Sequence, residues 1–121
     1  MYLLTVRGRR SGQPRTVALA MSERNGSRYV GSPYGIVDWV RNLRAAGEAT
    51  LTRGRRSETV KATELPKGEA AFILREEIKS GNPFGHFYGV TADSSFEEFE
   101  RAVLLHPLFL LERKMNGSIH E

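Results

Sequence analysis

The sequence predicts a small domain that is mainly β with added α-helices, in which five or six short antiparallel strands form a barrel. The first half of the chain alternates short runs of strand-forming residues with glycine turns. One helical pattern interrupts these runs, and the second half adds two more helical patterns and a last apolar run. With 121 residues, the chain is long enough for a single domain spanning residues 1–121.

Three strands are predicted in the first 31 residues. Residues 2–6, 16–21 and 28–31 are rich in strand formers, and Asn25-Gly26 between the last two is a strong signal for a tight hairpin. We therefore expect these strands to form a three-stranded antiparallel meander. Residues 51–56 and 58–63 predict two more strands, the second with one face in water.

The helical patterns follow ordinary start and stop signals. A first helix is expected from about Val37 to Gly47, where glycine is a typical C-terminal cap. Pro66 starts a second, whose apolar stripe would be Phe72, Ile73 and Ile78.

A third helix and a closing strand complete the predicted elements. Residues 94–98 offer overlapping capping boxes for a helix that runs to about residue 105. The apolar run 107–111 predicts a strand buried on both faces, and residues 82–93 form an aromatic-rich loop.

Charge is distributed unevenly along the chain. Residues 1–61 hold 12 Lys and Arg against 4 Asp and Glu, a net charge of +8, whereas residues 62–121 hold 6 against 10, a net charge of −4. This asymmetry favours a polyanionic partner. The chain contains no cysteine, and it shows neither an apolar run long enough for a membrane span nor a signal-peptide pattern, so a cytoplasmic location is expected.

The run Gly8-Arg9-Arg10-Ser11-Gly12-Gln13-Pro14-Arg15-Thr16 connects the first two predicted strands. Glycines allow backbone N–H groups to converge on an anion, and arginine presents a planar fork of donors that matches phosphate oxygens. The run therefore predicts a phosphate cradle for a nucleotide-like or flavin-like cofactor. A solvated basic hairpin is the alternative for this run taken alone.

A second segment, residues 31–47, places serine, proline and glycine at a strand-to-helix junction, where the backbone can approach a planar ring. Trp39 and Asn42 follow one helical turn apart and can line one pocket. Taken alone, Trp39 is more typical of a core anchor and Asn42 of a surface position.

The two segments together resemble the deazaflavin-dependent nitroreductase and quinone reductase family, whose members use the reduced coenzyme F420. The resemblance rests on the Gly8–Arg15 turn and the Trp39–Ala45 helix, in that order, and covers residues 3 to 65 well. It implies a split β-barrel of the FMN-binding, pyridoxamine-oxidase-like type. It also implies a reductase that transfers a hydride from F420 to a small acceptor such as a quinone, enone or nitro compound.

The resemblance implies a set of cofactor-binding positions. The phosphate and acidic-tail contacts match Arg9, Arg10, Ser11 and Arg15, and the strand beneath the cofactor matches Thr16, Val17, Ala18, Leu19 and Ala20. The segment beside the ring matches Val30, Gly31, Ser32 and Pro33, and the flanking helix matches Asp38, Trp39, Arg41 and Asn42.

The sequence offers several candidate proton donors but no pattern of metal ligands. Ser32 and Tyr34 beside the ring, or Tyr88 from the aromatic loop, are the candidate catalytic proton donors, with His86 more typical of a structural residue. The three histidines are scattered, so no metal site is expected. The chain departs from the family at Ala20, where some relatives carry tyrosine.

Two other functions remain open at this stage. An FMN-binding split-barrel flavoprotein would share the barrel and the loop. A non-enzymatic basic module would bind nucleic acid through Arg9, Arg10, Arg15, Arg53, Arg55 and Arg56, although the basic half lacks an aromatic stacking array, so we expect no nucleic-acid partner. The same arginines would allow weak peripheral association with an anionic membrane. Split barrels often dimerise, so a homodimer is a further expectation.

Overall fold

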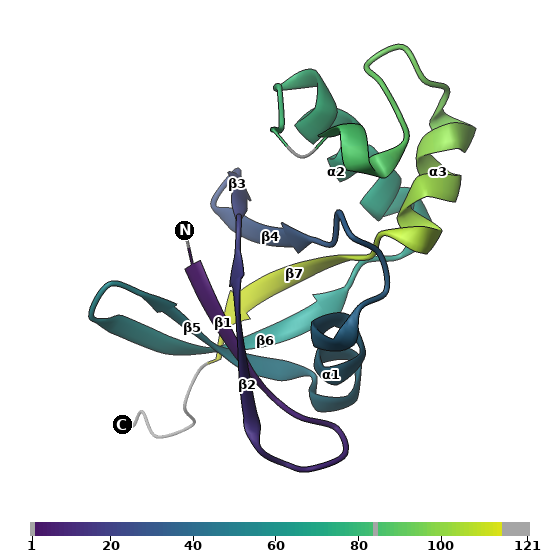
Figure 1. The fold of residues 1–121 in the computed structure, drawn as a ribbon. Coiled ribbons are helices and arrows are strands. Elements are labelled where there is room, and N and C mark those ends of the chain that lie inside the picture. The colour runs from purple at the N-terminus through teal and green to yellow at the C-terminus, as the bar shows by residue number, and fades with distance from the viewer. Residues whose placement is uncertain (1, 84, 115–121) are drawn as a thin grey trace.

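The computed structural model describes residues 2–83 and 85–114 (Figure 1). Its elements in chain order are β1 (Tyr2–Arg7), β2 (Pro14–Leu19), β3 (Ser22–Arg24), β4 (Ser27–Gly31), α1 (Asp38–Ala46), β5 (Glu48–Arg53), β6 (Arg56–Glu64), α2 (Lys67–Lys79), the short 3-10 helix η1 (Gly85–Tyr88), α3 (Phe96–Leu105) and β7 (Leu108–Arg113). Mixed β and α structure, with helices inserted among and flanking the strands, is as the sequence predicts.

The strands form one antiparallel sheet in the order β2-β1-β5-β6-β7-β4-β3. Its two edge strands, β2 and β3, are consecutive in the chain and are separated only by Ala20 and Met21. The sheet must therefore curl until its edges nearly meet, because two residues span only about 7 Å. In Figure 1, β2 runs directly up into β3 along one side of the curled sheet.

The predicted three-stranded meander is only partly present. Its middle strand is broken at Ala20–Met21, so that β1 pairs with β2 below the break while β4 pairs with β3 above it. The other neighbour of β4 is β7, from the far end of the chain. The Asn-Gly hairpin is confirmed, since Asn25 and Gly26 both have positive φ, at 51° and 82°.

Helix α1 covers one opening of the curled sheet and closes the main core (Figure 1). Val40 and Leu43 are buried, as their spacing predicts, and they pack with apolar residues from β1, β4, β5, β6 and β7. Gly47 ends the helix in the left-handed conformation with φ 72°, which confirms the predicted cap.

The predicted apolar stripe of α2 is wrong at Phe72, whereas Ile73 and Ile78 are partly buried against the second core as predicted. The buried residues are Ala70, Ala71 and Leu74, whereas Phe72 is 49% exposed. Small residues face inward because α2 packs closely against α3, and a phenylalanine would not fit between the two helices.

Helix α3 and strand β7 follow the sequence signals. The Ser95 side chain accepts from the Glu98 N–H and the Glu98 side chain accepts from the Ser95 N–H, so the capping box is formed. Adjacent residues of β7 enter different cores: Phe109 lies in the barrel core, and Leu108 lies in a second core between α2, α3 and η1. This explains why both faces of the strand are apolar.

Candidate functional site

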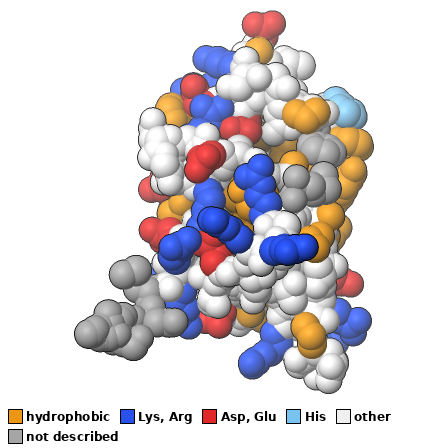
Figure 2. Space-filling model, turned by 90° about the vertical axis from the view of Figure 1, so that its left-hand side faces the viewer, with side chains coloured by type: hydrophobic (Ala, Val, Ile, Leu, Met, Phe, Trp, Pro, Cys, Tyr) orange, Lys and Arg blue, Asp and Glu red, His pale blue; other side chains and the backbone are white. Residues whose placement is uncertain are grey.

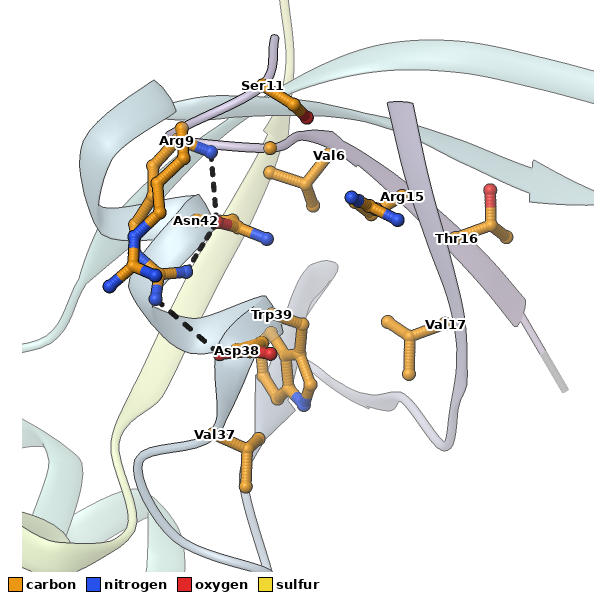
Figure 3. A pocket seen from close by; sticks show the side chains of 12 residues that line it. Val6, Arg9, Ser11, Arg15, Thr16, Val17, Val37, Asp38, Trp39 and Asn42 are labelled. Carbon is orange, nitrogen blue, oxygen red and sulfur yellow. Dashed lines mark hydrogen bonds and ion pairs between the residues drawn. The ribbon is translucent and has the colours of Figure 1, made fainter. Parts of the chain in front are cut away.

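A groove of about 670 Å³ lies between strand β2 and helix α1 and is bounded at one end by the β1–β2 loop, residues 8–13. Figure 3 shows Arg15 and Val17 pointing into it from β2, with Trp39 and Asn42 entering from α1 on the other side. We call it the arginine groove. Its lining residues are Val6, Gly8, Arg9, Arg10, Ser11, Arg15, Thr16, Val17, Val37, Asp38, Trp39 and Asn42.

The β1–β2 loop is ordered by its own backbone. The Gly8 N–H donates to the Gln13 carbonyl at 2.8 Å, and the Gly12 N–H donates back to the Gly8 carbonyl at 2.9 Å. The Gln13 N–H donates to the Ser11 hydroxyl. A Cβ at Gly8 would lie 3.1 Å from both Gln13 O and Ser11 Oγ, so the tight turn favours glycine at this position.

These bonds change the interpretation of the loop. The N–H groups of Gly8, Gly12 and Gln13 are bonded within the loop, and that of Arg9 donates to Asn42 Oδ1. The predicted backbone nest is therefore not formed by these four groups, because an anion would have to displace bonds already made. The arginine side chains are therefore the donors that remain available to an anion at this site.

Arg9 is held against α1. Its backbone N–H and its Nη1 both donate to Asn42 Oδ1, at 3.1 and 2.7 Å, and its Nη2 lies 3.5 Å from Asp38 Oδ1. Figure 3 shows Arg9 lying along the helix, while Asn42 Nδ2 faces the groove. Asn42 is 5% exposed, and with its oxygen occupied, it presents a donor to whatever fills the groove.

Arg10 and Arg15 differ from Arg9. Both are exposed, and within residues 2–83 and 85–114 neither side chain makes an ion pair or a hydrogen bond. Two guanidinium groups without acidic partners thus line one groove. This is a donor set suited to phosphate or carboxylate oxygens.

The groove is continued past Trp39 by a second cavity of about 290 Å³, which we call the aromatic pocket. It lies between the barrel and the helical end of the molecule, and Trp39 lines both cavities. The ion pair between Arg24 of β3 and Glu77 of α2, at 2.8 Å, joins the two sides. The lining residues of the aromatic pocket are Ala18, Leu19, Ala20, Met21, Ser22, Tyr29, Gly31, Pro33, Tyr34, Trp39, Leu74, Glu77, Asn82, Pro83, Tyr88 and Leu108.

Tyr88 presents a protonated phenol to this pocket. It is buried, and burial together with the nearby Glu77 carboxylate raises the pKa of Tyr88 above its usual range. Its hydroxyl lies so close to strand β4 that a Cβ on Gly31 would stand 2.7 Å from Tyr88 Oη. Glycine at position 31 is what allows this approach.

Ser32 occupies a structural setting. It is 1% exposed, its hydroxyl donates to the Gly35 carbonyl, and its N–H donates to the Pro107 carbonyl. Its own carbonyl accepts from His106 Nδ1 at 3.0 Å, which fixes the proton on that ring nitrogen. Its proposed role as a proton donor stays a prediction, in a place where the hydroxyl is already engaged.

Most of the predicted cofactor positions lie together. Nine of them line the arginine groove: Arg9, Arg10, Ser11, Arg15, Thr16, Val17, Asp38, Trp39 and Asn42. Those that line the aromatic pocket are Ala18, Leu19, Ala20, Gly31, Pro33 and again Trp39, together with the candidate catalytic residues Tyr34 and Tyr88. Three positions line neither cavity: Val30, which is in the barrel core, Ser32, and Arg41, which is 3.9 Å from Asp38.

The sequence analysis missed one wall of the aromatic pocket. Leu74 and Glu77 come from α2, and Tyr29 and Leu108 come from paired strands β4 and β7. Glu77 follows another glutamate in a helix and carries no local signal of its own. Only the packing of α2 against the barrel identifies it.

Other basic side chains lie on the side of the molecule from which the β5–β6 hairpin projects. Figure 2 faces the side on which the β5–β6 hairpin projects in Figure 1, and it shows Lys and Arg side chains gathered across the face, with acidic side chains among them. Arg53, Arg55 and Arg56 are exposed at this hairpin. Arg53 lies over the Tyr2 ring at 5.3 Å.

The family model for F420H(2)-dependent quinone reductase matches residues 1–94, more than three quarters of the chain. The chain belongs to the F420H2-dependent quinone reductase family. It is therefore an F420-dependent oxidoreductase, and F420 is its cofactor, as the motifs of the β1–β2 loop and α1 predict.

Solved structures confirm the fold of this family member. An F420-H2 dependent reductase (FDR-A) superposes with a TM-score of 0.64 at 23% identity, over 92% of each chain. A protein described as a domain-swapped dimer gives 0.65 at 22% identity, over 92% of this chain and 78% of the other. An FAD-binding protein from Mesorhizobium loti gives 0.58 at 15% identity, over 94% and 80%. The split-barrel prediction is confirmed.

No curated protein sequence is significantly similar to this chain. Across the described residues, no three His, Asp or Glu side chains are grouped to hold a metal ion. Among the helices of the described part, none has the length and apolar character that crossing a membrane requires.

The residues present fit F420. Its tail carries a phosphodiester and several carboxylates, and the two guanidinium groups without acidic partners match these acceptors. A planar ring needs apolar walls, which the aromatic pocket offers at Trp39, Leu74 and Leu108.

Proposed function

We propose that this reductase binds the anionic part of F420 in the arginine groove and reduces a small planar acceptor, a quinone first of all, at the aromatic pocket. One observation supports this most directly. Two arginines without acidic partners line a groove that continues past Trp39 into a largely apolar pocket containing a protonated phenol.

Arg10 and Arg15 would bind the phosphodiester and the carboxylates of the cofactor. Each charge-assisted hydrogen bond to a partly desolvated oxygen contributes about 1.5–3 kcal/mol. Asn42 Nδ2 adds a neutral donor between the arginine end of the groove and Trp39. These groups bind and orient the cofactor but do no chemistry on it.

The aromatic pocket would exclude water from the reacting face. Reduced F420 supplies a hydride when it is bound. Trp39, Leu74 and Leu108 form apolar walls, and Tyr88 keeps its proton because its pKa is raised. Its hydroxyl can therefore donate a hydrogen bond to an acceptor oxygen and stabilise the negative charge that develops there. Enones and nitro compounds carry oxygens that fit the same role.

FMN is the cofactor of the alternative function that the sequence alone left open. It carries a single phosphate and no acidic tail, so it would use fewer of the positive charges in the groove. The presence of both Arg10 and Arg15 favours the more anionic cofactor.

The test is the oxidation of reduced F420 by a water-soluble quinone, followed by the return of the oxidised cofactor's absorbance. Wild-type protein should accelerate the reaction, and Tyr88→Phe should lower kcat about tenfold or more while changing the Kd for F420 little. Tyr2→Phe, which removes a phenol hydroxyl outside both cavities, is the matched control. No acceleration by the wild type would overturn the proposal, and an unchanged kcat for Tyr88→Phe would remove Tyr88 from it.

Two further partners stay proposals. A homodimer is supported by the neighbour described as a domain-swapped dimer, and light scattering after gel filtration would distinguish it from a 13.6 kDa monomer. Peripheral binding to an anionic membrane is supported by the arginines of the β5–β6 hairpin, and sedimentation with anionic vesicles at low and high salt measures it.

A further inference from the structure

We propose that the arginines of the groove have two different roles. Arg9 is a positioning residue that fixes the β1–β2 loop to helix α1 through Asn42 and Asp38, and Arg10 and Arg15 alone bind the anionic part of the cofactor. The binding role of Arg10 and Arg15 rests on the proposed function. The positioning role of Arg9 concerns the protein without its cofactor.

We call the contact between Arg9 and Asn42 the clamp. It consists of one buried acceptor, Asn42 Oδ1, and two donors from Arg9. Asn42 Oδ1 receives the backbone N–H of Arg9 at 3.1 Å and its Nη1 at 2.7 Å. Because Asn42 is 5% exposed, losing these bonds would leave a buried polar oxygen unsatisfied. The two bonds hold the main chain of the loop and the Arg9 side chain at once.

Asp38 neutralises the clamp. Its carboxylate lies 3.5 Å from Arg9 Nη2 and 3.9 Å from Arg41 Nη1, and 83% of its side chain is exposed. The Arg9 side chain is only 24% exposed. An anion in the groove therefore meets an arginine whose charge is balanced and whose Nη1 is occupied, so Arg9 adds little attraction.

Arg10 depends on the clamp for its position. It follows Arg9 directly, and the Gly8–Gln13 bonds close the loop around it. A loop fixed in this way loses less conformational entropy when an anion binds. The clamp would therefore raise the affinity for the cofactor by ordering the loop in advance. Arg15, which projects from strand β2, is positioned by the sheet and does not need the clamp.

The first test needs no cofactor. Backbone amide exchange at Arg9, measured by NMR, should be protected in the wild type, and Asn42→Leu should speed it about tenfold or more. Asn42→Asp keeps an oxygen acceptor at the same place and should retain most of the protection. Equal exchange in the wild type and Asn42→Leu would overturn the clamp.

The second test is a fluorescence titration with F420. Asp38→Asn, at an exposed site, should bind F420 several-fold more tightly at low salt, because it frees the charge of Arg9 and removes a negative charge from the groove. A several-fold loss of affinity would mean that Asp38 contacts the cofactor, and would overturn this part of the proposal.

A double-mutant cycle then separates positioning from contact. At high salt, where the charge that Arg9→Met removes from the groove is screened, Arg9→Met combined with Asn42→Leu should weaken F420 binding no more than Asn42→Leu does alone, since Arg9 acts through Asn42. Arg15→Ala combined with Asn42→Leu should instead show additive losses. Additive losses for the Arg9 pair would make Arg9 a cofactor contact. If wild-type protein does not bind F420, the proposed function fails, and the exchange experiment still decides the clamp.

Discussion

Gly31 and Tyr88 approach each other closely in the aromatic pocket. The Tyr88 hydroxyl occupies the space that a side chain at position 31 would fill, 2.7 Å from an ideal Cβ. The next nearest atoms, Leu108 Cγ and Tyr88 Cζ, would lie at 3.6 and 3.7 Å, which is ordinary van der Waals contact. The hydroxyl alone therefore makes glycine necessary at this position.

Gly31→Ala should lower the free energy of unfolding by about 1–3 kcal/mol, because the buried Tyr88 ring must shift. In a Tyr88→Phe background the same change should cost under about 1 kcal/mol, because the clashing atom is gone. Urea unfolding of the wild type, Gly31→Ala, Tyr88→Phe and the double variant measures both values. Equal costs in the two backgrounds would show that the hydroxyl does not lie against Gly31.

The raised pKa of Tyr88 makes a prediction about pH. The phenol stays protonated through and beyond its ordinary pKa of about 10, because burial and Glu77 both disfavour the phenolate. The rate of quinone reduction should therefore show no fall caused by Tyr88 ionisation between pH 7 and about 10. A fall in the wild-type rate near pH 8 or 9 that is absent in Tyr88→Phe would contradict this.

At the level of single residues, sequence motifs identified one cavity better than the other. The positions from Arg9 to Val17 and from Asp38 to Asn42 were found because they lie on two contiguous segments with distinctive residue types. The role of Arg9 could not be predicted, because the bonds to Asn42 join residues 33 positions apart. The same limit applies to the backbone of Ser32, whose N–H and carbonyl are bonded to Pro107 and His106.

Helix α1 forms one wall of the arginine groove, and its C-terminal end depends on Gly47. This residue has φ 72°, and its N–H donates to the Leu43 carbonyl at 2.8 Å. Gly47→Ala should lower the free energy of unfolding by about 1 kcal/mol, since a Cβ is disfavoured in this conformation.

Gly68 in the first turn of α2 is the matched control for that substitution. Its φ is not in the left-handed region, and an added Cβ would meet nothing within 4 Å. Gly68→Ala should raise the free energy of unfolding by about 0.5 kcal/mol. Thermal and urea unfolding of both variants check the opposite signs; the same sign for both would refute the cap.

Three strands are joined by the carboxylate of Glu58 in β6. It accepts from both terminal nitrogens of Arg28 in β4, at 2.8 and 3.0 Å, and from Arg113 Nε in β7 at 3.4 Å. The Arg28 guanidinium first of all, and then Arg113, hold the pKa of Glu58 below its usual range, against the opposing effect of burial. Glu58→Gln should therefore cost about 1 kcal/mol at pH 7.

The pH dependence of this cost follows from its sign. A carboxylate whose folded pKa is lowered stabilises the protein fully above its unfolded pKa, about 4.3, and this stabilisation is lost as the pH falls through the folded value. The difference between wild type and Glu58→Gln should thus shrink in acid. Glu112→Gln, at an exposed position on β7 without an ion pair among the described residues, should show no such difference. A constant difference from pH 7 to pH 3 would contradict the assignment.

Element boundaries could be predicted where the signal is local. The Asn25-Gly26 hairpin, the Gly47 cap and the Ser95 capping box each depend on a few adjacent residues. The buried face of α2 could not be predicted, because Ala70, Ala71 and Leu74 are chosen by the close approach of α3. The pairing of β4 with β7 joins residues about 80 positions apart and has no local signal.

Over the whole molecule, the curl of the sheet is what joins the two predicted motifs. Because β2 and β3 form opposite edges of one sheet and are linked by two residues, β2 is brought opposite α1, and β3 is brought opposite α2. The arginine groove lies between β2 and α1, and the aromatic pocket lies between the barrel and α2. The sequence predicts a barrel with a phosphate cradle, but the second cavity exists only because the helical end of the molecule packs beside β3.

The measurement that tests the central claim most directly is a fluorescence titration with F420, and with FMN in parallel. Wild-type protein should bind F420 with micromolar or tighter affinity and FMN much more weakly. Arg10→Ala combined with Arg15→Ala should weaken F420 binding about 100-fold or more, since two charge-assisted contacts of about 1.5 kcal/mol are lost. Arg55→Ala combined with Arg56→Ala removes the same charge from the β5–β6 hairpin and should change affinity less than about threefold. Unchanged F420 affinity in the groove variant, or tighter binding of FMN than of F420, would contradict the account.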